Sequence, residues 1–193
     1  MQCCVYCNRL REYRQYQEGL IADLDSEVGL AILDTRDLDR VPSTKLISTY
    51  NFASGSPGYQ ARASKKKLFR KSVAVTQDQM LQSIEALIPR DRQVVFVGHN
   101  IQHDLRALDL LGFDFSKYQI TFLDTQSVSA EIISYKSLTL RRLLLMLDCP
   151  FRKLHCGGND PNFTLKALLL LAIRACVKQA RVKRRLATLK EIA

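Results

Sequence analysis

Runs of apolar residues predict several strands in this chain. Residues 27–34 and 94–97 are short and almost continuously apolar, as is typical of strands buried in a sheet. Residues 45–52 alternate between apolar and polar side chains and are rich in β-branched and aromatic types. A further strand is predicted over residues 119–124. The short connection 35–44 allows the first two strands to pair antiparallel.

Apolar residues at helical spacing predict helices between and after these strands. Thr76 is a candidate N-cap for a helix that ends near Leu87, with Met80, Leu81 and Ile84 on one face. Further helices are predicted over 101–111, over 137–147 and from Pro161 to beyond Ala180. Because helices separate the later strands, those strands are expected to be parallel. The sequence therefore predicts an α/β fold, with a mixed sheet that is antiparallel at its N-terminal strands, parallel later, and flanked by helices.

The remaining segments are polar. Residues 1–19 are rich in Arg, Tyr and Gln without a clear period, so we interpret them as an N-terminal extension with room for a short helix. Residues 53–72 shift to Gly, Ser, Pro and Lys, which indicates a long loop. The predicted domain therefore covers residues 20–176, and residues 177–193 form the basic end of the last helix.

Composition predicts a protein of the cytoplasm or nucleus without a membrane partner. Hydrophobic residues make up 47% and charged residues 25% of the chain, the usual mix of a globular protein. The longest apolar run, 167–173, is far shorter than a membrane span. The first twenty residues contain arginines and no apolar segment of the signal-peptide kind. Cys4 and Cys7 have zinc-like spacing, but a structural zinc site needs four ligands, so reduced free thiols are favoured.

A net charge of +10 favours a polyanionic partner, most simply a nucleic acid. Two clusters concentrate the charge. Their members are Arg62, Lys65, Lys66, Lys67, Arg70 and Lys71 in the loop, and Lys178, Arg181, Lys183, Arg184, Arg185 and Lys190 at the end. Phe69 lies within the first cluster, where an aromatic ring could stack on an unpaired base. The alternative is a solvated loop and a basic helix end that serves the helix dipole or nuclear import.

A first polar segment with candidate chemistry follows the strand at 94–97. Gly98 permits a tight turn, and His99, Asn100 and Asp104 come next, at the strand end where open α/β sheets bind ligands. Asn100 and Asp104 are four residues apart, so one helical face could present both. The alternative is structural, with Asn100 as an N-cap and Asp104 as a first-turn acid.

A second polar segment leads into the last predicted helix. Gly157 and Gly158 would let the backbone approach an anion closely. His155 stands five residues before Asp160, a spacing that suits proton transfer beside a metal carboxylate. The structural alternative makes Asp160 an N-cap followed by Pro161, which leaves the histidine and the glycines unexplained.

Together these segments resemble a known family. The combination of Gly98-His99-Asn100-x-x-x-Asp104 with His155-x-x-x-x-Asp160 resembles the second and third motifs of the DEDDh 3′→5′ exonucleases, which have an RNase H-like fold. Residues 122–125, Phe-Leu-Asp-Thr, resemble the family's strand after the second motif. Residues 94–173 are similar to a fungal subgroup of RNase H-like proteins, some linked by description to messenger RNA export. The resemblance covers residues 27–173.

The resemblance implies a phosphodiester hydrolase that uses two Mg²⁺ or Mn²⁺ ions. Asp104 and Asp160 would be metal ligands, and His155 would be the base that deprotonates the attacking water. Single-stranded nucleic acid is the implied substrate, with RNA favoured over DNA. The residues expected to contact it are His99, Asn100, Gly157, Gly158, Asn159, Lys65, Lys66 and Lys67.

The first motif of the family departs from its pattern here. The family has an Asp-x-Glu on a strand that precedes a strand resembling residues 27–34. The available candidates for metal ligation are Asp23 and Asp25, which would share one face of a strand. Only Ser26 separates them from the next strand, too little for a hairpin, so the alternative makes them solvated turn acids.

Three functions follow from these observations. The first is a metal-dependent 3′→5′ exonuclease that acts on single-stranded RNA or DNA. The second is a catalytically inactive nucleic-acid-binding module that keeps the exonuclease fold, and it is motivated by the altered first motif. The third is a protein-interaction scaffold whose basic tail contacts an acidic partner.

Overall fold

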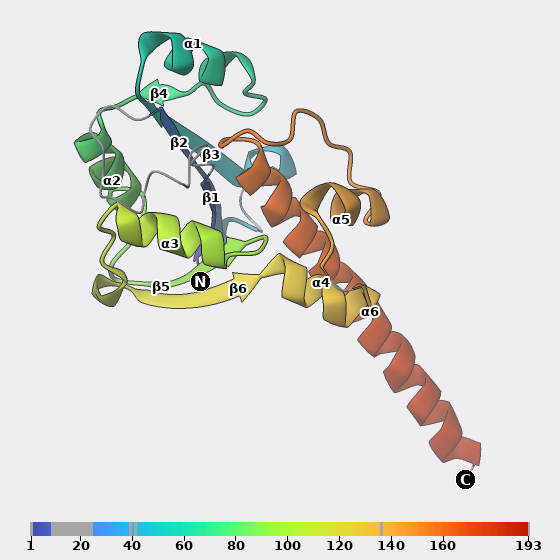
Figure 1. Ribbon diagram of the computed structural model, residues 1–193. Coiled ribbons are helices and arrows are strands. Elements are labelled where there is room, and N and C mark those ends of the chain that lie inside the picture. Colours follow the sequence, from blue (N-terminus) through green and yellow to red (C-terminus); the bar gives the residue numbers. More distant parts are fainter. Residues whose placement is uncertain (1, 9–24, 39, 41, 136, 193) are drawn as a thin grey trace.

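The structure, a computed structural model, describes residues 2–8, 25–38, 40, 42–135 and 137–192 (Figure 1). For residues 2–8, 43 and 181–192 it describes the backbone alone. The strands are β1 (Gln2–Asn8), β2 (Ser26–Asp34), β3 (Ile47–Ser54), β4 (Val73–Ala74), β5 (Gln93–Gly98) and β6 (Gln119–Asp124). The α-helices are α1 (Pro57–Lys65), α2 (Gln77–Glu85), α3 (Gln102–Leu110), α4 (Thr125–Ile133), α5 (Leu140–Met146) and α6 (Asp160–Ile192). Short 3-10 helices cover Thr35–Asp37, Ser43–Lys45 and Phe115–Lys117.

The strands form one mixed sheet in the order β4-β3-β2-β1-β5-β6. β2 pairs antiparallel with both β1 and β3. β1 with β5, β5 with β6, and β3 with β4 pair in parallel. This arrangement confirms the predicted α/β class with antiparallel N-terminal strands and parallel later ones, and it is compatible with an RNase H-like fold.

Helices cover both faces of the sheet, with α2 and α3 on one side and α4, α5 and α6 on the other (Figure 1). Side chains alternate between the faces along each strand. On β2, Val28 and Leu30 join the core beneath α2 and α3, whereas Ala31 and Leu33 pack with Leu165 of α6. The far end of α6 projects away from the sheet (Figure 1). Within the described ranges, no helix has the length and apolar character needed to cross a bilayer.

The interpretation of residues 1–19 as an extension is wrong for Gln2–Asn8, which form β1 inside the sheet. Val5 pairs with Ala31 on one side and with Val97 on the other. The sequence of this strand is rich in cysteine, which is among the residue types most often buried. Because the residues after it are polar, the pattern of apolar positions does not indicate a buried strand. A strand of the sheet therefore precedes β2 in the chain.

Most other predicted elements are confirmed within one to three residues, whereas the loop 53–72 is wrong and the sequence does not predict β4 and α4. Residues 53–72 are not one long loop, because β3 continues to Ser54 and α1 follows. α1 begins where the Ser56 hydroxyl accepts from the Tyr59 amide and Pro57 takes the first helical position. Its apolar face is so small that the pattern of apolar residues does not indicate a helix. α4 was not predicted because it starts directly at the end of β6, capped by Asp124.

Candidate functional site

The two polar segments that contain the predicted site residues lie at the same end of the strands of the sheet. Asn8 at the end of β1 lies opposite Val28 near the start of β2, and Gly98 of β5 lies opposite Asp124 of β6. The carboxyl ends of β1, β5 and β6 therefore share this edge with the amino end of β2. This is the position at which open α/β sheets bind ligands.

Asp160 and Asp104 flank β1 at this edge. The loop 155–160 lies over the start of β2, because the Gly157 carbonyl packs against Gly29. α6 begins at Asp160, while Asp104 lies in the first turn of α3, which follows β5. Both carboxylates are largely buried, and both helices contact β1. The two helices lie on opposite faces of the sheet, so the carboxylates approach β1 from either side.

Asn100 is not the N-cap of α3, and it does not share a helical face with Asp104. It is exposed and has a left-handed backbone with φ of 64°, a conformation that asparagine tolerates better than most residues. The N-cap of α3 is Ile101, which makes no side-chain cap bond. The Asn100 amide instead donates to Asp124 Oδ1 at 2.9 Å, and the same oxygen accepts from the Gln126 amide that begins α4.

His99 connects two parts of the fold through both ring nitrogens. Nε2 lies 2.7 Å from the Leu138 carbonyl, and Nδ1 lies 3.0 Å from the Thr125 hydroxyl. Burial lowers the pKa of His99, although the Leu138 carbonyl and the charge of Asp124 act in the opposite direction. This arrangement gives His99 a structural role, and its contact with substrate stays a prediction.

We expect acid to destabilise the fold through His99. Because its pKa is lower in the folded chain than the usual value of about 6.5, the unfolded chain binds more protons as the pH falls below that value. The free energy of unfolding therefore decreases from pH 7.5 toward pH 5, measurable as a lower urea midpoint. The substitution His99→Gln should flatten this dependence. A dependence that is equally steep in His99→Gln would contradict the assignment.

The backbone of His155 is anchored to Asp160. The His155 amide donates to Asp160 Oδ1 at 2.9 Å, and His155 has a left-handed φ of 63°. Its side chain is exposed and lines a pocket described below. The two residues that the third motif predicted to work together are therefore neighbours, and Asp160 serves as an acceptor for the loop.

Gly157 and Gly158 allow the loop to pack closely on the sheet. Both glycines are buried. A Cβ on Gly29 would lie 1.6 Å from the Gly157 carbonyl oxygen, and a Cβ on Gly157 would lie 2.7 Å from Glu27 Cγ. Gly157 therefore packs against Glu27 of β2, and Gly158 against Asn51 of β3 and Lys67, while the approach of an anion to these glycines stays a prediction.

A buried ion pair that the sequence did not predict lies under this loop. Lys67 Nζ forms a salt bridge with Glu27 Oε1, and the two side chains are only 2% and 10% exposed. The same ammonium donates to Cys156 Sγ at 3.2 Å. Burial lowers the pKa of Lys67, and the neighbouring Cys156 and Asp160 partly oppose that effect. Lys67 is therefore not the solvated phosphate ligand predicted, whereas Lys65 and Lys66 are exposed.

Asn159 joins the loop to the segment that holds Lys67. Its Oδ1 accepts from the Leu68 amide at 3.0 Å. Its Nδ2 donates to the Lys66 carbonyl at 3.1 Å and to the Lys153 carbonyl at 2.9 Å. The side chain is fully buried, and its donors and acceptor are all used by backbone groups. Asn159 is thus a structural link, although the sequence suggested a substrate contact.

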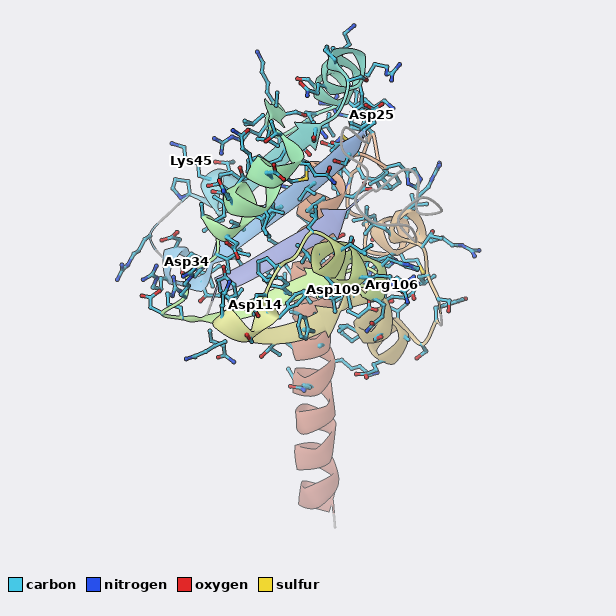
Figure 2. All side chains as sticks on the ribbon, turned by 60° about the vertical axis from the view of Figure 1, so that its left-hand side comes forward. Asp25, Asp34, Lys45, Arg106, Asp109 and Asp114 are labelled. Atoms are coloured by element: carbon cyan, nitrogen blue, oxygen red, sulfur yellow. The ribbon has the colours of Figure 1, made fainter. Side chains whose placement is uncertain are left out.

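The predicted acidic pair of the first motif does not stand on a strand of the described sheet. Asp23 lies outside the described residues, and Asp25 precedes β2. Asp25 Oδ1 accepts from the amide of Ser56 at 2.8 Å and from its hydroxyl at 2.9 Å, so Asp25 supports the turn into α1. Figure 2 shows Asp25 and Asp34 at opposite ends of β2. β1 itself contains neither Asp nor Glu in its sequence.

A cationic pocket of about 230 Å³ opens beside the buried ion pair. It lies between α1 and the loop 155–160, and it is lined by Glu27, Tyr59, Arg62, Ala63, Lys65, Lys66, His155 and Cys156. Exposed Arg62, Lys65 and Lys66 gather positive charge around it. An anionic group such as a phosphate is the ligand that this charge favours.

Three of the six cysteines have described side chains. Cys149, Cys156 and Cys176 are free thiols. The side chains of Cys4 and Cys7 lie outside the described residues, as do most of the basic side chains at the end of α6.

Comparison with known proteins gives one family whose model matches most of the chain. A family model described as DNA polymerase III subunit epsilon-like, C-terminal domain, of the DEDDh type, matches residues 22–171, more than three quarters of the chain. No curated protein matches the chain. The matched region includes both polar segments and begins after β1.

Proposed function

Because this chain belongs to the DEDDh exonuclease-type family, we propose that it is a nucleic-acid-binding domain that keeps the exonuclease fold without hydrolysing its ligand. The observation on which this proposal depends is the buried ammonium group of Lys67. It lies between Glu27 and Cys156 and interacts electrostatically with Asp160. The chain thus has an internal cation that interacts electrostatically with the carboxylate that the third motif assigns to a metal.

The carboxylates that the described residues offer do not fit a two-metal centre. DEDDh exonucleases generally use divalent metal ions, which need several carboxylate oxygens. The first strand of this chain supplies no carboxylate, and Glu27 is already paired with Lys67. Among the residues that the structure describes, no three His, Cys, Asp or Glu side chains are grouped to hold a metal ion. A divalent ion approaching Asp160 would also be repelled by the Lys67 ammonium.

Positive charge supports nucleic acid as the ligand. The chain carries a net charge of +10, and exposed Arg62, Lys65 and Lys66 border the pocket beside His155. Such side chains bind phosphates without regard to base sequence. Single-stranded RNA is the ligand we propose, in line with the likeness to the fungal subgroup linked to messenger RNA export. The cytoplasm or nucleus is the matching location.

Salt dependence tests this binding function. We expect the logarithm of the affinity for a labelled single-stranded RNA to fall linearly with the logarithm of salt concentration, as measured by fluorescence anisotropy. The substitution Lys66→Glu should weaken binding and reduce the slope by about 0.7 for each phosphate that is no longer neutralised. Lys45→Glu is the matched control, because exposed Lys45 precedes β3 at the Asp34 end of the sheet (Figure 2). Equally weakened binding in the two variants would refute a local phosphate site.

Metal-dependent 3′→5′ exonuclease activity is the second candidate function. It is favoured by one observation, that Asp104 and Asp160 are both buried carboxylates flanking β1 at one sheet edge. Under this candidate, the purified chain shortens single-stranded RNA or DNA from the 3′ end with Mg²⁺ or Mn²⁺, and His155→Ala abolishes the activity. Activity that is unchanged in His155→Ala would assign the nuclease to a contaminant.

A further inference from the structure

A second pocket lies on the other side of the segment that holds Lys67. It measures about 280 Å³ and is lined by Leu68, Phe69, Pro150, Phe151, Arg152, Phe163 and Lys166. The residues come from the segment after α1, the loop after α5 and the first turns of α6. Neither the second nor the third motif of the family includes any of them.

Aromatic rings and cations form the wall of this pocket. The Phe69 and Phe163 ring centroids are 5.4 Å apart in an edge-to-face arrangement, and Phe151 contacts Phe163 in the same way at 6.5 Å. Lys166 Nζ lies 4.6 Å from the Phe69 centroid. Phe163 is buried, whereas Phe69 is 40% exposed. Packing thus holds in place a ring that still presents a large surface to solvent.

The residues that line this pocket favour a ligand with a flat aromatic group and a negative charge beside it. Exposed Phe69 offers a stacking surface, and the positive charges of Arg152 and Lys166 border it. The volume of about 280 Å³ is just below the range of about 300–1,000 Å³ for pockets that hold drug-sized ligands, which suits one base rather than a folded segment. A base with its flanking phosphates matches both features, because bases stack on aromatic side chains beside cationic tracks.

The pocket lies close along the chain to the cationic site already described, although the two share no lining residue. Phe69 is three residues from Lys66, so the two positions are at most about 11 Å apart along the chain. Asn159 fixes the connecting segment through the Leu68 amide and the Lys66 carbonyl. A strand whose phosphates follow Lys65 and Lys66 can therefore bring a nearby base to Phe69.

We propose that the Phe69 pocket is a stacking subsite for one unpaired base of a single-stranded nucleic acid, with Arg152 and Lys166 beside its flanking phosphates. This inference rests on the proposed nucleic-acid-binding function and adds a preference for single strands. In a duplex each base is stacked and paired, so it is not available to this pocket.

The test compares two ligands of equal length on the full chain by fluorescence anisotropy. One is a labelled single-stranded RNA, and the other is a labelled strand of abasic residues that keeps the phosphates. Phe69→Ala should weaken RNA binding about 5- to 150-fold, the effect of losing one stacked base, and should leave abasic binding within about twofold. Phe69→Leu should act similarly while retaining apolar packing. Tyr135→Ala, at an aromatic residue that is 59% exposed outside the pocket, should leave both affinities unchanged.

Each other outcome contradicts the subsite in a distinguishable way. If the Phe69 variants lose affinity for both ligands equally, the ring acts through the fold or the phosphate track. If they bind RNA as tightly as the parent chain, the pocket is not a stacking subsite. If the parent chain binds neither ligand, the proposed function itself fails, and the subsite fails with it. Circular dichroism melting confirms that each variant is folded before binding is measured.

Discussion

The substitution Lys67→Met is expected to lower the free energy of unfolding by about 3–5 kcal/mol, because it leaves the buried Glu27 carboxylate without a partner. The ammonium that compensates this charge is 2% exposed, so water cannot take its place without opening the loop. Urea unfolding followed by circular dichroism measures the change. Lys66→Met is the matched control, because the exposed neighbouring lysine should change stability by no more than about 0.5 kcal/mol.

A double substitution distinguishes the effect of the lost ion pair on stability from the effect of the changed side-chain size. Removing both charges in Lys67→Met/Glu27→Gln should restore part of the stability that Lys67→Met loses, because replacing a buried pair by neutral groups is often close to neutral. The account of a buried ion pair is wrong if Lys67→Met has the stability of the parent chain. It is also wrong if Glu27→Gln adds a full independent loss on top of Lys67→Met.

The substitution Gly29→Ala is expected to destabilise the chain by about 3 kcal/mol or more, at or above the usual range for overpacking. The added Cβ would lie 1.6 Å from the Gly157 carbonyl oxygen. This neighbour is backbone, so it cannot rotate away as a side chain could, and the loop 155–160 must move. The urea midpoint should fall accordingly.

The matched control for this prediction is Gly58→Ala. Gly58 lies in α1, and a Cβ there would meet no atom within 4 Å. The substitution should therefore be neutral or stabilising by up to about 1 kcal/mol, because alanine favours helices more than glycine does. If Gly29→Ala unfolded at the same urea concentration as Gly58→Ala, the loop would not pack on β2 as described.

Local signals predicted much of the fold. β6 begins and ends as expected, and Thr76 caps α2 in a capping box with Gln79. These elements depend on neighbouring residues, so a single sequence is enough to find them. β1 differs, because its place in the sheet depends on pairing with β2 and β5 rather than on its own pattern.

The candidate site was only partly predictable for the same reason. The sequence located His155 and Asp160, and the structure makes them neighbours through one hydrogen bond. Lys65, Lys66 and Lys67 look alike in the sequence, yet only Lys67 has a buried side chain, because its partner Glu27 comes from a distant strand. The pattern of consecutive lysines contains no sign of that pairing. A buried charge pair of this kind becomes visible only in three dimensions.

The most direct test of the central claim asks whether bound RNA is cut. The purified chain, in excess over a 5′-labelled single-stranded RNA at low salt, is incubated with Mg²⁺ or Mn²⁺, and binding and strand length are followed in parallel. The account predicts RNA that is bound and keeps its full length. Progressive shortening from the 3′ end that disappears in Asp160→Asn would contradict it and establish the chain as an active exonuclease.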